Sequence, residues 1–389
     1  MSMRDRSARR GPLAAAAVLA VLASGGLGAQ TDEGRAPAPA PIAAAQVEAD
    51  FHDSHFHLTN YIQEGITVQR FLEIMGTRVG RSTLFGIPLQ QTWSYGNSGD
   101  YAPTYYLHSD APLYYYSFTD AYIAQAYRSL PKDLQARFDP MITGFNPSDM
   151  YAADHITRVL RTFPGVFSGI GEFSIHKEFV SSKVAGETAS LTNPALDRVL
   201  DVAGEIGLVV VLHNDIDMPF AKTDAEPVYL TQTKALLKRH PKTTIIWAHT
   251  GLGRVVHPVQ LSAAVAAAER SPNHVEIVEQ MLGDPALSHL YFDISWDEVA
   301  KYAVRTPETI ARVAEMLNKY PDRIRVGTDA VAPSAPGPYF AVHDMWTPVW
   351  QALTPDARAK VKKGNYVRLF DEARRRVRAW EAASARGDQ

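Results

Sequence analysis

The chain has 389 residues, with 39 Lys and Arg against 42 Asp and Glu, 13 His and no Cys. Its formal net charge of −3 provides no long-range positive field to gather nucleic-acid phosphates or anionic lipid, so we expect no nucleic-acid partner. Without Cys, zinc fingers, iron–sulfur clusters, thiol nucleophiles and disulfide scaffolds are excluded, and a transition-metal site must be built from His and carboxylate side chains. The length allows either two ordinary domains or one large single-core fold.

The N-terminal segment has the composition of a targeting sequence rather than of a fold. Four arginines between residues 4 and 10 precede an apolar run over 13–23, and small residues follow up to Ala29. This order predicts a secretory signal peptide over 1–29, because the apolar run is short for a bilayer span; a retained membrane anchor is the alternative. Residues 30–47 form an Ala/Pro-rich linker. We therefore expect one folded domain over 48–389, exported to the periplasm or secreted, with no membrane association after cleavage.

From there on, short apolar runs alternate with stretches of helical periodicity. The expected strands are Phe51–Leu58, Ser82–Leu89, Pro140–Asn146, Phe167–Ile175, Leu208–Asp215, Thr243–Gly251, His289–Trp296 and Arg323–Val331. The expected helices include Ala153–Phe163, Pro194–Ile206, Leu230–Arg239, His274–Leu282 and Pro307–Lys319. Eight strand–helix units predict an α/β fold, a (β/α)₈ TIM barrel with C-terminal helices. A doubly wound open sheet is the alternative, but no strand is followed by a Gly-rich phosphate-binding turn.

Polar residues at the carboxyl ends of these strands indicate a metal site. His55 and His57 are two apart on the first strand, so their side chains point the same way, as two ligands of one metal would. In a barrel, all carboxyl ends of strands open on one face. Each residue alone also fits a packing or capping role, but burying them together without a partner would cost several kcal/mol, and a divalent cation satisfies them all. The other residues at such ends are Glu172, His213, His249 and Asp329.

The His-Phe-His segment, the two later strand-end histidines and Asp329 in Gly-Thr-Asp-Ala resemble the amidohydrolase superfamily, closest to its amidohydrolase-related (amidohydrolase 2) branch. The resemblance covers about Ala49 to Phe370. It implies a (β/α)₈ barrel with one or two divalent ions that activate a water, zinc first and manganese or iron as alternatives. With two ions, Glu172 would bridge them. One ion would be held by His55, His57 and Asp329, and the other by His213 and His249. With one ion, the ligands would be His55, His57, His213 and Asp329, and His249 would position water or substrate.

This resemblance implies a hydrolase that cleaves an amide, ester, lactone or related bond of a small molecule. Asp329 would accept the proton of the water and pass it to the leaving group, and His249 is a second catalytic candidate. A non-oxidative decarboxylase of an aromatic or enoic acid is the alternative, because the related branch contains such enzymes. An exported metal-dependent binding protein without turnover is a third hypothesis, which the general base Asp329 argues against.

Substrate contacts are less defined by the sequence. The stretch Tyr95–Tyr127, after the second expected strand, is rich in tyrosine and predicts an enlarged loop on the catalytic face. Its aromatic side chains would form a wall for an apolar or ring-bearing substrate, pack onto the barrel, or form the subunit interface of a homo-oligomer. The candidate substrate contacts are Trp93, His176, Arg254 and Trp296, with Asp293 at the end of the seventh strand.

Overall fold

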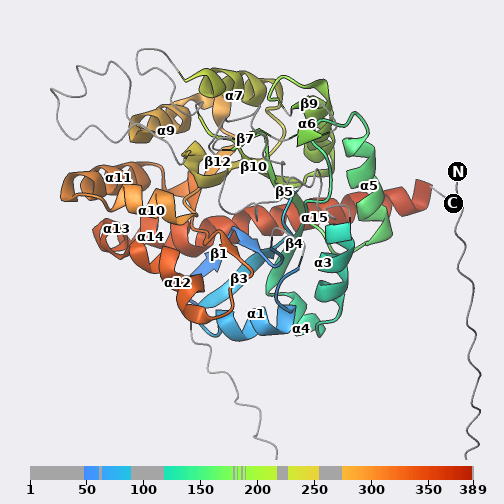
Figure 1. Cartoon of the computed structure of the whole chain (residues 1–389), viewed down its shortest axis with the longest axis horizontal. Helices are drawn as coiled ribbons and strands as arrows, with labels where there is room; N and C mark the ends of the chain where they lie inside the picture. The colour runs from blue at the N-terminus through green and yellow to red at the C-terminus, as the bar shows by residue number, and fades with distance from the viewer. Residues whose placement is uncertain are drawn as a thin grey trace, which may run out of the picture. The chain divides into compact units, whose positions relative to one another are not determined.

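The computed structural model describes residues 48–387, apart from 61–63, 89–117, 178–179, 182, 185–186, 189, 217–226 and 254–273. In this part of the chain, eight parallel strands form one sheet in the order β1-β3-β4-β5-β10-β11-β12-β13 (Figure 1). The strands are β1 (Phe51–Asp53), β3 (Val79–Leu84), β4 (Phe138–Ile142), β5 (Gly169–Ser174), β10 (Val209–His213), β11 (Ile245–Trp247), β12 (Leu290–Asp293) and β13 (Ile324–Arg325).

The sheet closes where the chain after β1 meets the chain after β13. The Ser54 amide donates to the Val326 carbonyl at 3.1 Å. Beyond it, β2 (Phe56–His57) pairs in parallel with β14 (Ala330–Val331). These bonds join the two edges of the sheet, so the chain forms a (β/α)₈ barrel as predicted, and the open-sheet alternative is wrong.

Helices follow the strands and cover the outside of the barrel (Figure 1). The sequence marks several of their starts: Asn193 accepts a hydrogen bond from the Ala195 amide, Thr306 accepts one from the Thr309 amide, and each is followed by Pro. The helices are α1 (Val68–Met75), α3 (Thr119–Arg128), α4 (Lys132–Gln135), α5 (Ala152–Thr162), α6 (Pro194–Ile206), α7 (Val228–Arg239), α9 (His274–Gly283), α10 (Asp297–Ala303), α11 (Pro307–Lys319), α12 (Pro336–Met345), α13 (Thr347–Ala352), α14 (Pro355–Ala359) and α15 (Asn365–Gly387).

Two apolar layers hold the barrel together. The outer layer lies between strands and helices and includes Leu212 and Phe292. The inner layer includes Val211 of β10 and Ile246 of β11, and Tyr366 and Phe370 of α15 pack against it. The C-terminal helix α15, red in Figure 1, therefore covers part of the barrel interior. Among the described residues, no helix is both long and apolar enough to cross a membrane.

The strands differ from the prediction mainly at their carboxyl ends. The expected strand Thr243–Gly251 ends at Trp247 and continues as the 3₁₀ helix η3 (Ala248–Gly251), because His249 and Thr250 have φ angles of 54° and 56°. The expected strand Phe51–Leu58 is divided into β1 and β2. Short hairpins follow β5: β6 (His176–Lys177) with β7 (Val180–Ser181), and β8 (Lys183–Val184) with β9 (Glu187–Thr188). The signal peptide, the linker and most of the aromatic insertion lie outside the described residues.

Candidate metal centre

The six predicted ligand residues come together at the carboxyl ends of the strands. His55 follows β1, His57 ends β2, Glu172 lies in β5, His213 ends β10, His249 lies in η3, and Asp329 precedes β14. Their ligand atoms form three overlapping groups, each with its atoms within 4.8 Å of one another: His55, His57 and Glu172; His55, His249 and Asp329; Glu172, His213 and His249. All six are buried except Asp329, whose side chain is 16% exposed.

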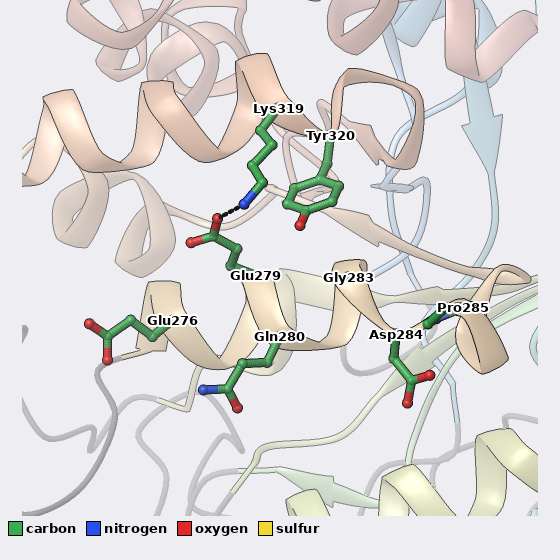
Figure 2. A pocket seen from close by; sticks show the side chains of 8 residues that line it. All are labelled: Glu276, Glu279, Gln280, Gly283, Asp284, Pro285, Lys319 and Tyr320. Atoms are coloured by element: carbon green, nitrogen blue, oxygen red, sulfur yellow. Dashed lines mark hydrogen bonds and ion pairs between the residues drawn. The ribbon is translucent and has the colours of Figure 1, made fainter.

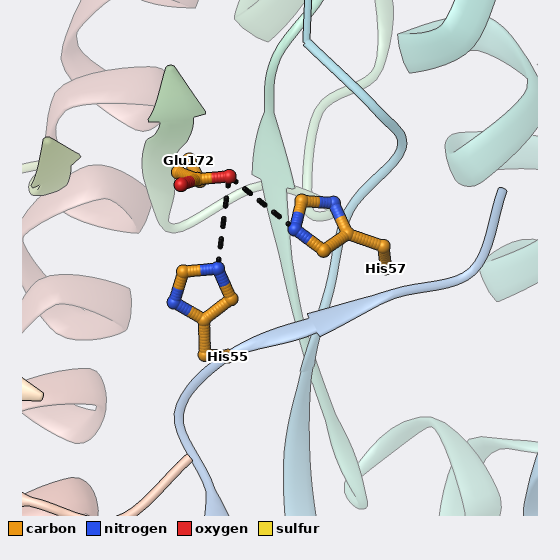
Figure 3. A group of neighbouring side chains, drawn as sticks. All are labelled: His55, His57 and Glu172. Atoms are coloured by element: carbon orange, nitrogen blue, oxygen red, sulfur yellow. Dashed lines mark ion pairs between the residues drawn. The ribbon is translucent and has the colours of Figure 1, made fainter. Parts of the chain in front are cut away.

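Glu172 lies between two pairs of histidines and offers each pair a different oxygen. Its Oε2 is 3.7 Å from His55 Nε2 and 3.4 Å from His57 Nε2 (Figure 3). Its Oε1 is 2.5 Å from His213 Nδ1 and 3.3 Å from His249 Nε2. The Glu172 carboxylate thus connects the two pairs of histidines.

Asp329 lies beside the first pair of histidines, His55 and His57. Its Oδ1 is 3.3 Å from His55 Nε2 and 3.5 Å from His57 Nε2, and its Oδ2 is 3.9 Å from His249 Nε2. The Asp329 amide donates to the His55 carbonyl at 2.8 Å, which fixes the residue against the first strand. Asp329 is therefore held beside the histidines while its side chain keeps some access to solvent.

Neighbouring groups turn the same nitrogen of three histidines toward the centre. His57 Nδ1 donates to the Gly86 carbonyl at 2.9 Å, and His55 Nδ1 lies 3.0 Å from Asp293 Oδ2. His249 Nδ1 lies 2.9 Å from Ser295 Oγ, and the Ser295 hydroxyl donates to Asp293. With each Nδ1 engaged as a donor, each Nε2 presents a lone pair to the centre, as in metal sites where outer partners fix the imidazole tautomer.

The donor set fits a divalent cation. His55 Nε2 is fully buried and, among the described residues, has no hydrogen-bond partner although two carboxylates lie nearby. A buried nitrogen that faces Glu172 and Asp329 needs a positive charge beside it, which either a proton or a divalent cation supplies. His213 has a different arrangement, because its Nε2 contacts Asp215 Oδ1 at 3.2 Å and its Nδ1 faces Glu172.

The pKa values of the cluster reflect the same mixture of charges. Burial alone would lower the pKa of His55, but Asp293 and Asp329 raise it well above its ordinary value. For His213, burial is likewise outweighed by Glu172, and the pKa is raised to about 9. Burial would raise the pKa of Asp329, but His249 and His55 lower it to about 2. Without a cation, His55 and His213 therefore hold protons at neutral pH, and metal binding must displace them.

Unusual backbone conformations occur at or directly before three of these residues. Gly171, with φ at +107°, precedes Glu172, and a Cβ there would lie 2.1 Å from the Val211 carbonyl oxygen. His249 and Asp329 are non-glycine residues with φ of 54° and 55°. Such left-handed residues cluster at functional sites, where the surrounding structure maintains them.

The candidate substrate contacts lie in different surroundings. Trp296 is half-buried at the start of α10, with its ring centroid 5.4 Å from that of His249. His176 is buried and stacks on Tyr229 at 3.6 Å, and burial lowers its pKa to about 4. Asp293 is fully buried, and its carboxylate contacts His55 Nδ1 and accepts a hydrogen bond from the His249 amide. Trp93 and Arg254 lie outside the described residues.

The sequence prediction missed two supporting residues, Ser295 and Asp215. Each stands two positions after a candidate residue, Ser295 after Asp293 and Asp215 after His213. Because side chains alternate along an extended chain, this spacing is a signal that could have identified them.

A separate groove of about 550 Å³ lies between α9 and α11 on the outside of the barrel (Figure 2). Glu279 stands at its centre and is already paired with Lys319 and Arg312. The groove contains none of the predicted ligands, so we assign it no catalytic role.

The fold and the site together place this chain among the (β/α)₈ barrel proteins that carry a candidate metal centre of histidines and carboxylates at the carboxyl ends of their strands. The family model described as Amidohydrolase (Amidohydro_2) matches residues 52–371, and the chain belongs to this family.

Solved structures of similar proteins include enzymes of two reaction types. They include dihydroorotase from Campylobacter jejuni, 13% identical over 83% of this chain and 83% of that chain, with a TM-score of 0.46. A second is 2,6-dihydroxybenzoate decarboxylase from Rhizobium, 13% identical over 83% of this chain and 99% of that chain, with a TM-score of 0.45. A third is 5-carboxyvanillate decarboxylase from Sphingomonas paucimobilis, 17% identical over 79% of this chain and 84% of that chain, with a TM-score of 0.44. At these identities and scores the likeness does not choose a reaction. A search of curated proteins found no match.

Proposed function

We propose that this chain is a metal-dependent hydrolase that cleaves an amide, ester, lactone or related bond of a small molecule with a water activated by two divalent cations. The observation that supports this most directly is Glu172, whose two oxygens face different pairs of histidines. One cation would be held by His55, His57 and Asp329, and the other by His213 and His249. Zinc is the first choice, because it favours imidazole and carboxylate ligands in small numbers.

Each residue then has a defined task. When bound, the cations supply a water of lowered pKa and polarise a substrate carbonyl. Asp329, whose side chain is the most accessible of the six ligand residues, takes the proton from the water and delivers it to the leaving group. Its low pKa keeps it ionised at neutral pH. Trp296, near His249, and the buried His176 would contribute to the substrate side of the centre.

A decarboxylase with a single cation is the second candidate, and one observation favours it. His213 bonds to Glu172 and to Asp215 at the same time, so these three residues can satisfy one another without a cation. A lone cation would then bind to His55, His57 and Asp329, orient a substrate carboxylate, and leave His249 or Asp329 to protonate the carbon that loses carbon dioxide.

A substrate panel separates the two candidates. Purified protein reconstituted with zinc, and separately with manganese, is incubated with lactones, esters, amides and aromatic acids. We expect hydrolysis of at least one of the first three classes and no release of carbon dioxide. Carbon dioxide release from an aromatic acid, with no hydrolysis, would replace the hydrolase with the decarboxylase.

We also propose that the protein is exported, because its N-terminal segment has the order of a signal peptide. N-terminal sequencing of protein recovered from the periplasm or medium tests this. A mature start between residues 24 and 30 is expected, and an intact Met1 on protein confined to the cytoplasm would contradict it.

A further inference from the structure

Three arginines surround one tyrosine near the amino ends of β12 and β13. Their guanidinium carbons lie 5.4, 5.3 and 5.5 Å from the centroid of the Tyr291 ring, for Arg323, Arg325 and Arg368 respectively. Tyr291 is the second residue of β12, and Arg323 directly precedes β13. The cluster therefore lies toward the end of the barrel opposite the candidate metal centre.

Arg325 is the unusual member of this cluster. It is 0% exposed, and none of its three guanidinium nitrogens has a hydrogen-bond partner among the described residues. A guanidinium offers five N–H donors in a fixed plane and stays charged, so leaving it buried without an acceptor is costly. Burial lowers the pKa of Arg325 to about 10, which still leaves it a cation at neutral pH.

The other two arginines bind only neutral acceptors. Arg323 donates to the carbonyls of Leu287 and Leu290. Arg368 donates to the Asp322 carbonyl at 2.7 Å and to the Tyr291 hydroxyl at 3.3 Å. Arg368 is exposed, so the cluster extends from solvent to the buried Arg325.

Among the described residues, no carboxylate forms a direct ion pair with these arginines, although Asp293 acts on Arg325 through its charge. The Asp322 side chain pairs with Lys360 instead. Asp293, which lies beside Arg325 in the strand register, already accepts bonds from His55, Ser295 and the His249 amide. The hydrogen-bond acceptors of Arg323 and Arg368 are therefore all neutral, and Arg325 has no acceptor of its own.

We propose that Arg323, Arg325 and Arg368 form a binding site for a small oxyanion, with the anion entering past Arg368 and accepting hydrogen bonds from Arg325. Arginine is suited to this role because its planar fork matches the spacing of two oxygens in a phosphate, sulfate or carboxylate group. Tyr291 holds the guanidinium groups in a common position by cation–π contact. This site does not depend on the metal chemistry of the opposite face.

Thermal unfolding of the metal-loaded protein tests the proposal, with sulfate and malonate as probes against choline chloride at equal ionic strength. We expect a saturable rise in Tm with at least one probe. The larger response shows whether a tetrahedral anion or a dicarboxylate fits better, and either supports the site.

Two variants and a control locate the effect. Arg325→Met removes the buried charge at similar volume, and Arg368→Gln removes the exposed one; each should weaken the anion by about tenfold or more. Arg375→Gln, at an exposed arginine that pairs with Glu372, should leave the response unchanged. Arg325→Met should also unfold at an equal or higher Tm than the native protein when no anion is present, because an uncompensated buried charge is gone.

Equal responses in the native protein and in Arg368→Gln would overturn the proposal, as would the absence of a saturable response in the native protein. Since Arg368 is exposed, its variant should fold even if Arg325→Met does not, so the test remains decisive.

Discussion

Asp293 organises the candidate metal centre at the scale of single residues. One of its oxygens contacts His55 Nδ1, and the other accepts bonds from the His249 amide and from Ser295. Through Ser295, it also fixes the imidazole of His249. Sequence reasoning located Asp293 at a strand end but could not assign this role, because strand position alone does not distinguish a side chain that faces substrate from one that lies beneath the ligands.

Replacing Asp293 with Asn tests this role. The amide cannot hold both histidines in the required tautomer as a carboxylate does, so zinc affinity should fall by about 10- to 100-fold. Competition with a chromogenic chelator measures the affinity. Asp356→Asn, at an exposed carboxylate paired with Lys360, serves as the matched control and should bind zinc normally. Unchanged zinc affinity in Asp293→Asn would contradict the assignment.

Replacing Asp329 with Asn removes the proposed general base while keeping the shape of the side chain. We expect kcat to fall by about 10²- to 10⁴-fold on any substrate found by the panel. Far-ultraviolet circular dichroism should show an intact fold. A variant with near-native kcat would exclude Asp329 as the group that carries the proton.

At the scale of elements, the ends of the strands hold conformations that the sequence pattern does not reveal. β11 was expected to continue through His249, but the chain turns into η3 there. Alternating and apolar patterns predict where a strand exists, whereas its last residues follow tertiary contacts. Gly171 shows the same limit, because its need to be Gly arises from the close Val211 carbonyl on the neighbouring strand β10.

The Gly171→Ala substitution tests this close packing. The new Cβ would meet the Val211 carbonyl oxygen at 2.1 Å and would force a side chain into positive φ. We expect the free energy of unfolding to fall by about 3 kcal/mol, from overpacking and backbone strain together. Urea denaturation measures it.

Gly337→Ala is the matched control for this substitution. No atom lies within 4 Å of a Cβ at Gly337, which is in α12. This change should stabilise the protein slightly, by about 0.5 kcal/mol. Equal effects at the two positions would show that the contact with β10 does not constrain Gly171.

His274, at the start of α9, supports the η3 turn and gives it a dependence on pH. Its Nε2 lies 2.9 Å from Thr250 Oγ1, and Thr250 in turn donates to the His249 carbonyl. Burial lowers the pKa of His274 from 6.5 to about 4. Between these two values, the unfolded chain binds a proton that the folded protein does not, so stability decreases as the pH falls from 6.5 to 4.

The variant His274→Gln can keep the bond to Thr250 but does not titrate. Its stability should therefore fall less steeply over this pH range, by up to about 1.4 kcal/mol per pH unit relative to the native protein. Urea denaturation at pH 7, 6, 5 and 4.5 provides the comparison. Parallel curves for the two proteins would mean that His274 is not buried in its neutral form.

At the scale of the whole molecule, the barrel could be predicted because it depends on a pattern that repeats along the whole chain. Eight apolar runs separated by helical stretches imply one closed sheet, and closure sends every carboxyl end to the same face. Residues as distant in the chain as His55 and Asp329 therefore come together. The fixing of tautomers could not be predicted, since the Gly86 carbonyl and Ser295 reach the histidines only through the folded geometry. The proposed oxyanion site likewise depends on burial, which composition does not reveal.

The central claim is that Glu172 joins two cations, and zinc stoichiometry tests it most directly. Metal-free protein is equilibrated with zinc, freed of excess and measured by elemental analysis, beside Glu172→Gln and the exposed control Glu315→Gln. We predict two zinc ions per chain in the native protein and in Glu315→Gln, and at most one in Glu172→Gln. A native protein that retains one zinc ion or none, or a Glu172→Gln variant that still retains two ions, would contradict the account.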